Sequence, residues 1–411
     1  MLYHLHELQR SFLNPMAAWA QASSALFSHP YSPLAYTPVS SRVAASYELL
    51  HRLGKTYSKP AWGLATTTVE GAEVPITEER VIDKPFCQLI HFRRDWPAAL
   101  ANRAPDPKVL LVAPLSGHHA TLLRDTVRAL LPNHEVWVTD WIDARQVPVS
   151  AGPFHLDDYV EYVIEFVQRL GPEVHLISVC QPTVPVLAAV SLMASRGDPK
   201  APRSMTMMGG PIDTRKSPTE VNALAIRKPF EWFENSVIFK VPPSYPGYLR
   251  RVYPGFLQHA GFVAMNPDRH LNSHWDYYLD LVKGDQEDIN SHRWFYDEYN
   301  AVLDLPAEYY LDTIKIVFQE HRLPLGTWTV RGERVAPEAI KRTALFTIEG
   351  ELDDISGSGQ TQAAAGLCRN IPAERQRHFT APGVGHYGIF SGRRWRELIA
   401  PQIAEFIRAN A

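Results

Sequence analysis

The stretch that decides the fold is Ser178-Val179-Cys180-Gln181-Pro182. It follows the apolar run Val174 to Ile177 and precedes Thr183 to Ala194, a segment rich in Ala, Leu and Val. These flanks predict a strand, a sharp turn and a helix, with Cys180 at the turn. Such a turn is the setting of a nucleophile elbow, where the usual motif is G-x-S-x-G and the motif here is S-x-C-x-P. Taken alone, the motif is equally compatible with a buried structural cysteine.

Two later segments favour a catalytic interpretation of Cys180. The apolar run Thr343 to Glu349 ends in Gly350-Glu351-Leu352-Asp353-Asp354, and a further strand-like run leads into the Gly-rich loop that contains His386. A single Asp after a strand is usually a turn former, and a single His in a glycine loop is usually solvated. The chain nevertheless places a nucleophile, an acid and a histidine in the triad order of α/β hydrolases, each at the end of a predicted strand. This order makes coincidence a poor explanation.

The three residue types suit acyl transfer. A cysteine thiolate is nucleophilic, whereas the free thiol is only partly ionised near neutral pH. A neighbouring imidazole takes the proton, and a carboxylate fixes the tautomer of that imidazole. The start of a helix directly after the turn also favours the thiolate.

The same chemistry requires an oxyanion hole. One donor is expected to be the backbone N–H of Gln181, the residue after the nucleophile. The second is expected from the loop that follows the predicted strand Val109 to Ala113, where Leu115 is the first candidate and Ser116 the next. Pro182 is compatible with this arrangement, because proline is tolerated in the first turn of a helix.

Composition excludes several classes of protein. The 411 residues are 45% hydrophobic and 21% charged, with a formal net charge of −3. These values are ordinary for a soluble globular protein and do not favour a nucleic-acid partner. Cys87, Cys180 and Cys368 are far apart and odd in number, which argues against a disulfide framework. The sequence has no CxxC or HExxH spacing and no dinucleotide motif, so we expect no metal and no cofactor.

The N-terminal residues do not resemble a secretory signal, because no basic start is followed by an unbroken apolar stretch. The sequence also contains no run of about 18 apolar residues, so no transmembrane helix is expected. A reducing, cytoplasmic location is the resulting expectation, and it suits a thiol nucleophile.

Predicted strands and helices alternate over most of the chain, which indicates a mostly parallel sheet with helices on both faces. The chain exceeds one average domain, and we expect a core with additions. The expected parts are an N-terminal helical extension (1–80), a first part of the α/β-hydrolase core (81–212), a cap insertion (213–342) and a second part of the core (343–411).

The cap segment is rich in aromatic residues. Residues 230–310 contain 18 aromatic side chains in 81 residues, roughly 22%, whereas 11% of the whole chain is aromatic. These side chains can form the cap's own core, line an apolar cleft, or do both.

The N-terminal segment carries an apolar stripe at helical spacing, in a helix predicted from Leu5 to Ala25. The stripe comprises Leu2, Leu5, Leu8, Phe12, Trp19, Leu26 and Phe27. It can pack on the core or form a surface for a partner or an apolar particle. The favoured interpretation is packing on the core.

Several segments resemble those of intracellular polyhydroxybutyrate (PHB) depolymerases, and the opening residues 1–19 are also similar to that family. The motifs are Ala113-Pro114-Leu115-Ser116-Gly117-His118, Thr139-Asp140-Trp141-Ile142-Asp143-Ala144-Arg145, Ser178-Val179-Cys180-Gln181-Pro182, Met208-Gly209-Gly210-Pro211-Ile212-Asp213 and Gly383-Val384-Gly385-His386-Tyr387-Gly388.

This resemblance implies an α/β hydrolase with a cysteine nucleophile that acts on stored polyester granules in the bacterial cytoplasm. It assigns the nucleophile to Cys180, the histidine to His386 and the acid to Asp353 or Asp354. Asp353 is preferred because related polyester enzymes place the acid two residues before an Ile, here Ile355. The implied partners are the poly(3-hydroxybutyrate) polymer and the granule surface.

Several alternatives remain open at this stage. Water or a thiol such as CoA can resolve the acyl-enzyme, and a homo-oligomer is compatible with the sequence. A polyhydroxyalkanoate synthase uses the same three residue types on this fold, although its elbow is G-x-C-x-G and Pro182 occupies the last position here. The other alternative is a non-catalytic granule-associated protein that has kept the fold.

Overall fold

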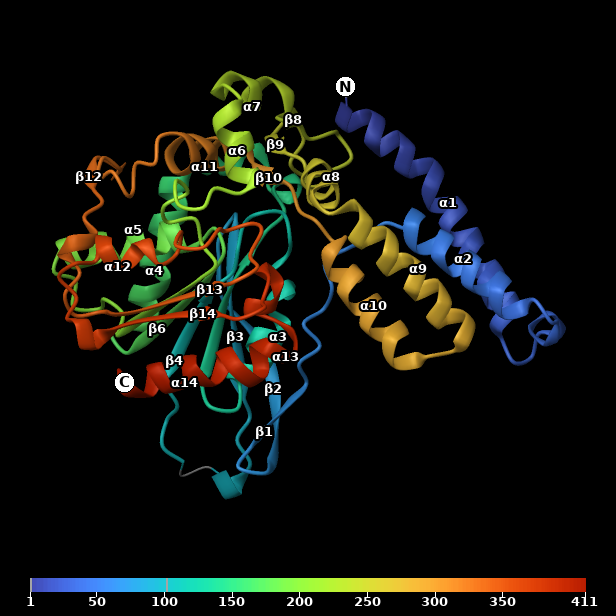
Figure 1. The fold of residues 1–411 in the computed structure, drawn as a ribbon, viewed down its shortest axis with the longest axis horizontal. Helices are drawn as coiled ribbons and strands as arrows, with labels where there is room; N and C mark the ends of the chain where they lie inside the picture. The colour runs from blue at the N-terminus through green and yellow to red at the C-terminus, as the bar shows by residue number, and fades with distance from the viewer. Residues whose placement is uncertain (1, 101–102) are drawn as a thin grey trace.

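A computed structural model describes residues 2–100 and 103–411. Its centre is a nine-stranded sheet in the order β1-β2-β3-β5-β4-β6-β7-β13-β14 (Figure 1). The six strands from β5 to β14 are parallel, and β1, β2 and β3 are added antiparallel at one edge. The strand bounds are β1 (Thr66–Val69), β2 (Ala72–Asp83), β3 (Cys87–Arg94), β4 (Lys108–Val112), β5 (Glu135–Trp141), β6 (Val174–Val179), β7 (Ser204–Met208), β13 (Ala344–Gly350) and β14 (Gln376–Ala381).

Helices cover both faces of this sheet, which confirms the predicted fold class. On one side α4 (Leu156–Leu170) packs against α5 (Thr183–Ser195), and on the other α3 (Arg124–Leu130) packs against α14 (Ala400–Ala409). The helix α5 is apolar all round and buried along most of its length, as expected for the helix at the centre of such a fold.

The boundary predicted at residue 80 is wrong, because the sheet begins at Thr66. Both β1 and most of β2 lie in the segment that was expected to be only helical. Along β2, exposed and covered residues alternate without a continuous apolar run. Such a strand near a sheet edge has two partly polar faces, and its sequence signal is correspondingly weak.

The insertion between β7 and β13 is mainly helical. Its elements are α6 (Glu220–Arg227), α7 (Phe230–Ser236), β8 (Phe239–Lys240), β9 (Arg251–Tyr253), α8 (Gly255–Met265), α9 (Pro267–Lys283), α10 (Gln286–Tyr299), β10 (Leu305–Pro306), α11 (Ala307–Thr313), β11 (Thr329–Val330) and β12 (Glu333–Arg334). The helices α6, α7, α8 and α11 lie over one end of the sheet, whereas α9 and α10 project away from it (Figure 1).

The N-terminal helices α1 (Leu2–Ser28) and α2 (Ser40–Gly54) lie beside α9 and α10, and together the four helices form what we call the helical arm (Figure 1). Arg52 of α2 binds Asp297 of α10 at 2.9 Å. Glu48 of α2 accepts hydrogen bonds from Tyr277 at 3.0 Å and from Arg293 at 2.8 Å. The N-terminal extension and part of the insertion therefore form one packed unit.

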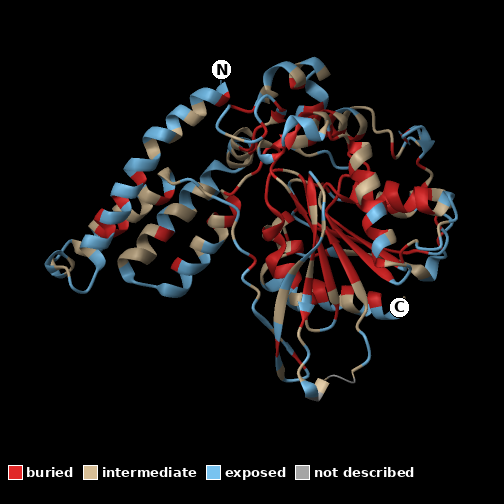
Figure 2. Ribbon diagram, turned by 180° about the vertical axis from the view of Figure 1, so that it is seen from behind, coloured by how far each residue is buried: buried red, intermediate tan, exposed pale blue. Residues whose placement is uncertain are grey.

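The favoured prediction that the apolar stripe of α1 packs on the core is wrong. Leu5, Phe12 and Trp19 are 58%, 66% and 59% exposed, and Figure 2 shows the outer helix exposed along most of its length. The side that faces the other helices is instead built from Tyr3 and from small residues such as Ala17 and Ala20. The helix is thus apolar on two sides, and the spacing of its large residues indicates only that they share a face.

Candidate active site

The turn between β6 and α5 holds Cys180 in a strained conformation. Its φ angle is 68°, in the left-handed region that non-glycine residues rarely adopt. The N–H of Cys180 donates to the carbonyl of Met208 on the neighbouring strand at 2.7 Å, and the N–H of Thr183 donates to the carbonyl of Cys180 at 3.1 Å. Strain held in this way by surrounding bonds is the geometry of a nucleophile elbow, which raises its side chain above the end of the sheet.

His386 and Asp353 form a buried pair at the same end of the sheet. His386 follows β14 and Asp353 follows β13, and the Nδ1 atom of His386 lies 2.8 Å from Oδ2 of Asp353. The other carboxylate oxygen, Oδ1, accepts the N–H groups of Ile355 at 2.9 Å and Ser356 at 2.8 Å. These bonds fix the carboxylate, which holds a proton on Nδ1 and leaves Nε2 as the atom that exchanges a proton with the reacting groups.

Cys180 lies close enough to His386 to interact with its imidazole. Burial by itself lowers the pKa of His386, but the charges of Asp353 and Cys180, together with hydrogen bonds to both, raise this pKa well above its usual value. The surroundings of His386 therefore favour its protonated form. The structure places near one another the three residues that the sequence suggested for the triad, Cys180, His386 and Asp353.

Asp354 is directed elsewhere. Its Oδ2 accepts a hydrogen bond from the side-chain amide of Asn266, in the insertion, at 2.9 Å. Of the two neighbouring carboxylates, only Asp353 touches His386 among the described residues.

The expected oxyanion-hole residues also gather at this end of the sheet. Within the part of the chain that the structure describes, the backbone N–H groups of Gln181, Leu115 and Ser116 have no hydrogen-bond acceptor. Gln181 and Leu115 are buried, and a buried N–H without a partner is rare unless it is kept for a ligand. All three N–H groups are thus available to a bound oxyanion.

Sequence reasoning missed Tyr309 of α11 as a member of the site. Its hydroxyl donates to Oε1 of Gln181, and its ring stacks on Tyr159 at 5.6 Å. Burial and the nearby charge of Cys180 raise the pKa of Tyr309 well above its usual value, so the hydroxyl keeps its proton. Tyr309 orients Gln181 beside the nucleophile. Nothing in the sequence separated it from the other aromatic residues of the insertion.

Gly209 is a second member that sequence reasoning left without a role. Its φ is +56°, and a Cβ atom there would lie 2.5 Å from Ile389 Cδ1, 3.2 Å from Asp353 Oδ2 and 3.3 Å from His386 Cε1. The glycine that follows β7 thus lets the backbone pass directly beneath the His–Asp pair. The available signal was its position at the end of a strand in the same sheet.

We expect Gly209→Ala to lower kcat on a soluble ester by tenfold or more, because the added methyl displaces the His–Asp pair. The matched control is Gly197→Ala, which has a similar φ of +65° but nothing within 4 Å of the added Cβ. Both substitutions should destabilise the fold by about 1 kcal/mol through the backbone. Equal kcat values for the two variants, measured beside thermal unfolding, would contradict a role for Gly209 in the site.

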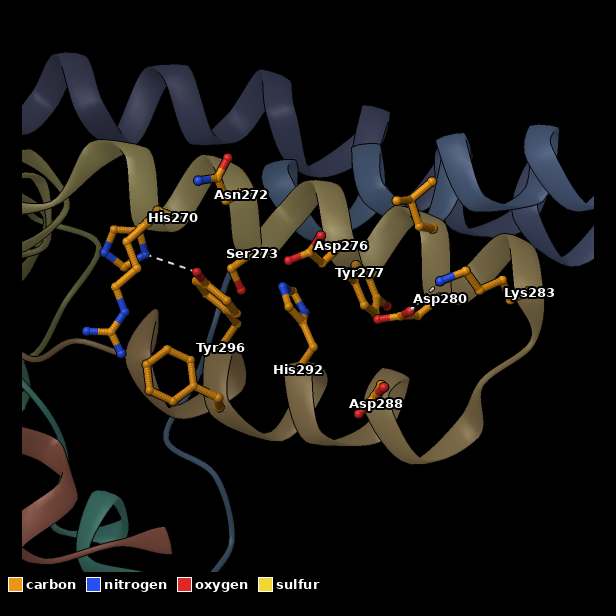
Figure 3. Close-up of a pocket in the computed structure, with 13 residues that line it drawn as sticks. His270, Asn272, Ser273, Asp276, Tyr277, Asp280, Lys283, Asp288, His292 and Tyr296 are labelled. Carbon is orange, nitrogen blue, oxygen red and sulfur yellow. Dashed lines mark hydrogen bonds and ion pairs between the residues drawn. The ribbon is translucent and has the colours of Figure 1, made fainter. Parts of the chain in front are cut away.

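A cavity of about 420 Å³ opens onto His386. Its lining includes Phe262, Met265, Phe295, Tyr299, His386 and Tyr387. Polar and charged side chains, among them Asn266, Arg269, Asp354 and Arg394, line it as well, so the cavity can bind a substrate that has both apolar groups and ester oxygens. A second hollow of about 730 Å³ lies in the helical arm between α9 and α10, lined largely by polar groups such as Asp276, Asp280 and Asp288 (Figure 3). None of Cys180, Asp353 and His386 lines this second hollow, whereas His386 lines the first cavity, so we assign the chemistry to the first cavity.

Among the described residues, no group of three or more His, Cys, Asp or Glu side chains is arranged to hold a metal ion. None of the described helices is long and apolar enough to cross a membrane.

A mostly parallel sheet with an elbow after β6 and a histidine loop after its last strand is the architecture of an α/β hydrolase. Residues 209–411 match the family model described as "PHB de-polymerase C-terminus". The chain therefore carries the C-terminal domain of the PHB depolymerase family and is an ester hydrolase, as the resemblance of its motifs predicted.

Similar solved structures share this fold at low identity, and no curated relative matches the sequence. The structure of DcsB with its substrate analogue is 15% identical and covers 82% of this chain and 100% of its own, with a TM-score of 0.45. The monoacylglycerol lipase of Paleococcus ferrophilus is 16% identical and covers 75% and 97%, with a TM-score of 0.43. A hydrolase from Pseudomonas aeruginosa PA01 is 13% identical and covers 81% and 98%, with a TM-score of 0.45.

Proposed function

We propose that this protein hydrolyses the ester bonds of stored poly(3-hydroxybutyrate) through a Cys180–His386–Asp353 triad and an acyl-enzyme. The observation that carries the proposal is the buried His386–Asp353 pair beside Cys180, at a cavity lined in part by aromatic side chains, in a chain with a PHB depolymerase domain. The three cysteines are unpaired, which suits a reducing cytoplasm as the place of action.

In the first half-reaction the Cys180 thiolate attacks the ester carbonyl. The oxyanion forms within reach of the N–H groups of Gln181 and of Leu115 or Ser116. As the tetrahedral intermediate collapses, the carbon–oxygen bond to the next unit breaks, and His386 gives its proton to the leaving hydroxyl oxygen. A shortened polymer chain leaves, and the remaining acyl group is held as a thioester on Cys180.

In the second half-reaction water attacks the thioester carbonyl and gives a proton to the now neutral His386. The carbon–sulfur bond breaks, which regenerates the thiolate and the imidazolium and releases a 3-hydroxybutyrate monomer or oligomer. Throughout both steps Asp353 holds the Nδ1 proton and stabilises the positive imidazolium.

Brief incubation with amorphous poly(3-hydroxybutyrate), followed by mass spectrometry, tests this function. We expect 3-hydroxybutyrate products in solution and an added hydroxybutyryl mass on the peptide that contains Cys180. Absence of both, in a preparation that hydrolyses a soluble butyrate ester, would rule out the polymer as substrate. Release of CoA from hydroxybutyryl-CoA with growth of polymer would instead identify a synthase.

The cavity is expected to contribute more to polymer than to a small ester, since a polymer segment must cover its apolar lining. Met265 lines the cavity, whereas its neighbour Ala264 on α8 is exposed and does not. Met265→Lys should lower the rate on amorphous polymer about fivefold more than the rate on nitrophenyl butyrate, because the substrate would have to desolvate a cation. Ala264→Lys is the control. The same rate ratio in both variants would show that the cavity does not bind polymer.

A further inference from the structure

The outward face of α1 is an unusual surface for a soluble protein. Its residues recur at intervals of three, four or seven, and therefore share one side of the helix: Leu5, Leu8, Phe12, Met16, Trp19 and Leu26. All six are more than half exposed. Single exposed apolar side chains are common, but a continuous row of six marks a surface that binds a partner. At 1.5 Å per residue the row is about 32 Å long.

Packing of the arm does not account for these side chains. The opposite side of α1 already contacts α2 and the body through Tyr3, Ala17 and Ala20, which are buried. Of the six, Trp19 lies edge-on to Tyr47 of α2, with 5.2 Å between the ring centres, and is still more than half exposed. The large residues thus lie on the exposed side of a helix whose inner side is packed, and Figure 2 colours most of the helix that begins at the N label as exposed.

This face also carries no formal charge. The only residues of α1 with an ionised side chain are Glu7 and Arg10, and both are turned towards the body. Glu7 accepts a hydrogen bond from Tyr245 at 3.0 Å, and Arg10 donates to Thr56 at 2.8 Å. A surface that recognised anionic lipid or nucleic acid would present Lys or Arg. An uncharged, apolar face instead matches an uncharged, apolar surface.

We infer that this face of α1 docks the protein on the surface of amorphous, neutral polyester. The inference rests on the proposed function, because that function supplies a water-insoluble and uncharged substrate. Docking on the arm is distinct from binding in the catalytic cavity, which lies at the base of the arm where α8, α9 and α10 meet the His386 loop. It raises the concentration of enzyme at the polymer surface without taking part in the chemistry.

Co-sedimentation with a colloid of amorphous poly(3-hydroxybutyrate) tests docking, with Cys180→Ala in every protein so that the polymer is not consumed. The test variant is Leu8→Gln with Phe12→Gln. The control is Ser11→Gln with Ala18→Gln, at exposed positions of α1 outside the row. We expect the test variant to bind at least about tenfold more weakly and the control to bind within twofold of the parent protein, since two large apolar groups are lost from the contact.

Folding is checked in the active background, where the Leu8/Phe12 double variant should hydrolyse nitrophenyl butyrate at the wild-type rate. Should that variant fail to fold, Leu5→Gln with Met16→Gln on the same face repeats the measurement. Three results would overturn docking: equal polymer binding by test and control variants, equally tight binding of the parent to phosphatidylcholine vesicles, or a dimer in the ultracentrifuge that the test variant dissociates.

The outcomes also separate docking from the proposed function. If the wild-type protein binds the polymer but never degrades it, the proposed function is wrong. If the wild-type protein and the Leu8/Phe12 variant bind and degrade the polymer equally well, docking by α1 is wrong and the proposed function stands.

Discussion

Cys180→Ala is expected to reduce kcat/KM for a soluble butyrate ester by about 10⁴-fold or more, because no other group can form the acyl-enzyme. Alanine fits the elbow, so the fold should remain intact. Cys180→Ser should retain part of the activity, since a hydroxyl can perform the same chemistry when the base is well placed. Steady-state kinetics beside circular dichroism measures both variants. Wild-type rates in the alanine variant would show that Cys180 is a structural residue, a role with which its motif alone is equally compatible.

The other two cysteines provide the controls. Burial raises the pKa of Cys368 to about 12 and that of Cys87 well above its usual value, so neither thiol forms a thiolate near neutral pH. Cys180 is the least buried of the three. Iodoacetamide should therefore modify Cys180 first, with loss of activity in parallel. Cys368→Ala should lower the free energy of unfolding but leave kcat/KM within about twofold, whereas an equal loss for Cys180→Ala and Cys368→Ala would remove the nucleophile assignment.

The three residues that the sequence predicts as the triad share one physical property. Cys180, Asp353 and His386 each follow a parallel strand, and the carboxyl ends of parallel strands meet at one edge of the sheet. Recognising the strands β6, β13 and β14 and the reactive residue after each is therefore enough to bring the three together. The spacing to Ile355 also has a structural reason, because the N–H of that residue donates to the Asp353 carboxylate.

Features that depend on packing between distant segments could not be predicted from local sequence patterns. The pairing of β1 and β2 has only a weak apolar pattern, and the arm joins helices more than 200 residues apart, as Glu48 and Arg293 illustrate. The spacing of the large apolar residues on α1 predicts that they share one face, but not whether that face is buried, because Ala17 and Ala20 on the opposite side are apolar as well. Tyr309 likewise acquires its role only where α11 meets the elbow.

Asp353→Asn is expected to reduce kcat/KM by about 10⁴-fold, by analogy with loss of the triad acid in a serine protease. The hydrogen bonds of Asp353 explain why. Its Oδ1 accepts the N–H groups of Ile355 and Ser356, so the oxygen of the new amide remains there and its NH₂ group faces Nδ1 of His386. The imidazole must then accept at Nδ1 and carry its proton on Nε2. In that tautomer it cannot take a proton from Cys180.

The same change has a consequence for pH dependence. Asp353 is one of the groups that raise the pKa of His386 above its usual value, so its loss lowers that pKa. The imidazolium then loses its proton at lower pH, and the alkaline limb of the kcat/KM profile should move to lower pH in Asp353→Asn. Asp354→Asn is the matched control, since Asp354 binds Asn266 and does not touch His386. It should stay within about threefold of wild type, with an unchanged profile. The reverse ranking of the two variants would transfer the role of the acid to Asp354, and an equal small loss in both would show that orientation of His386 by a carboxylate is not required for the reaction.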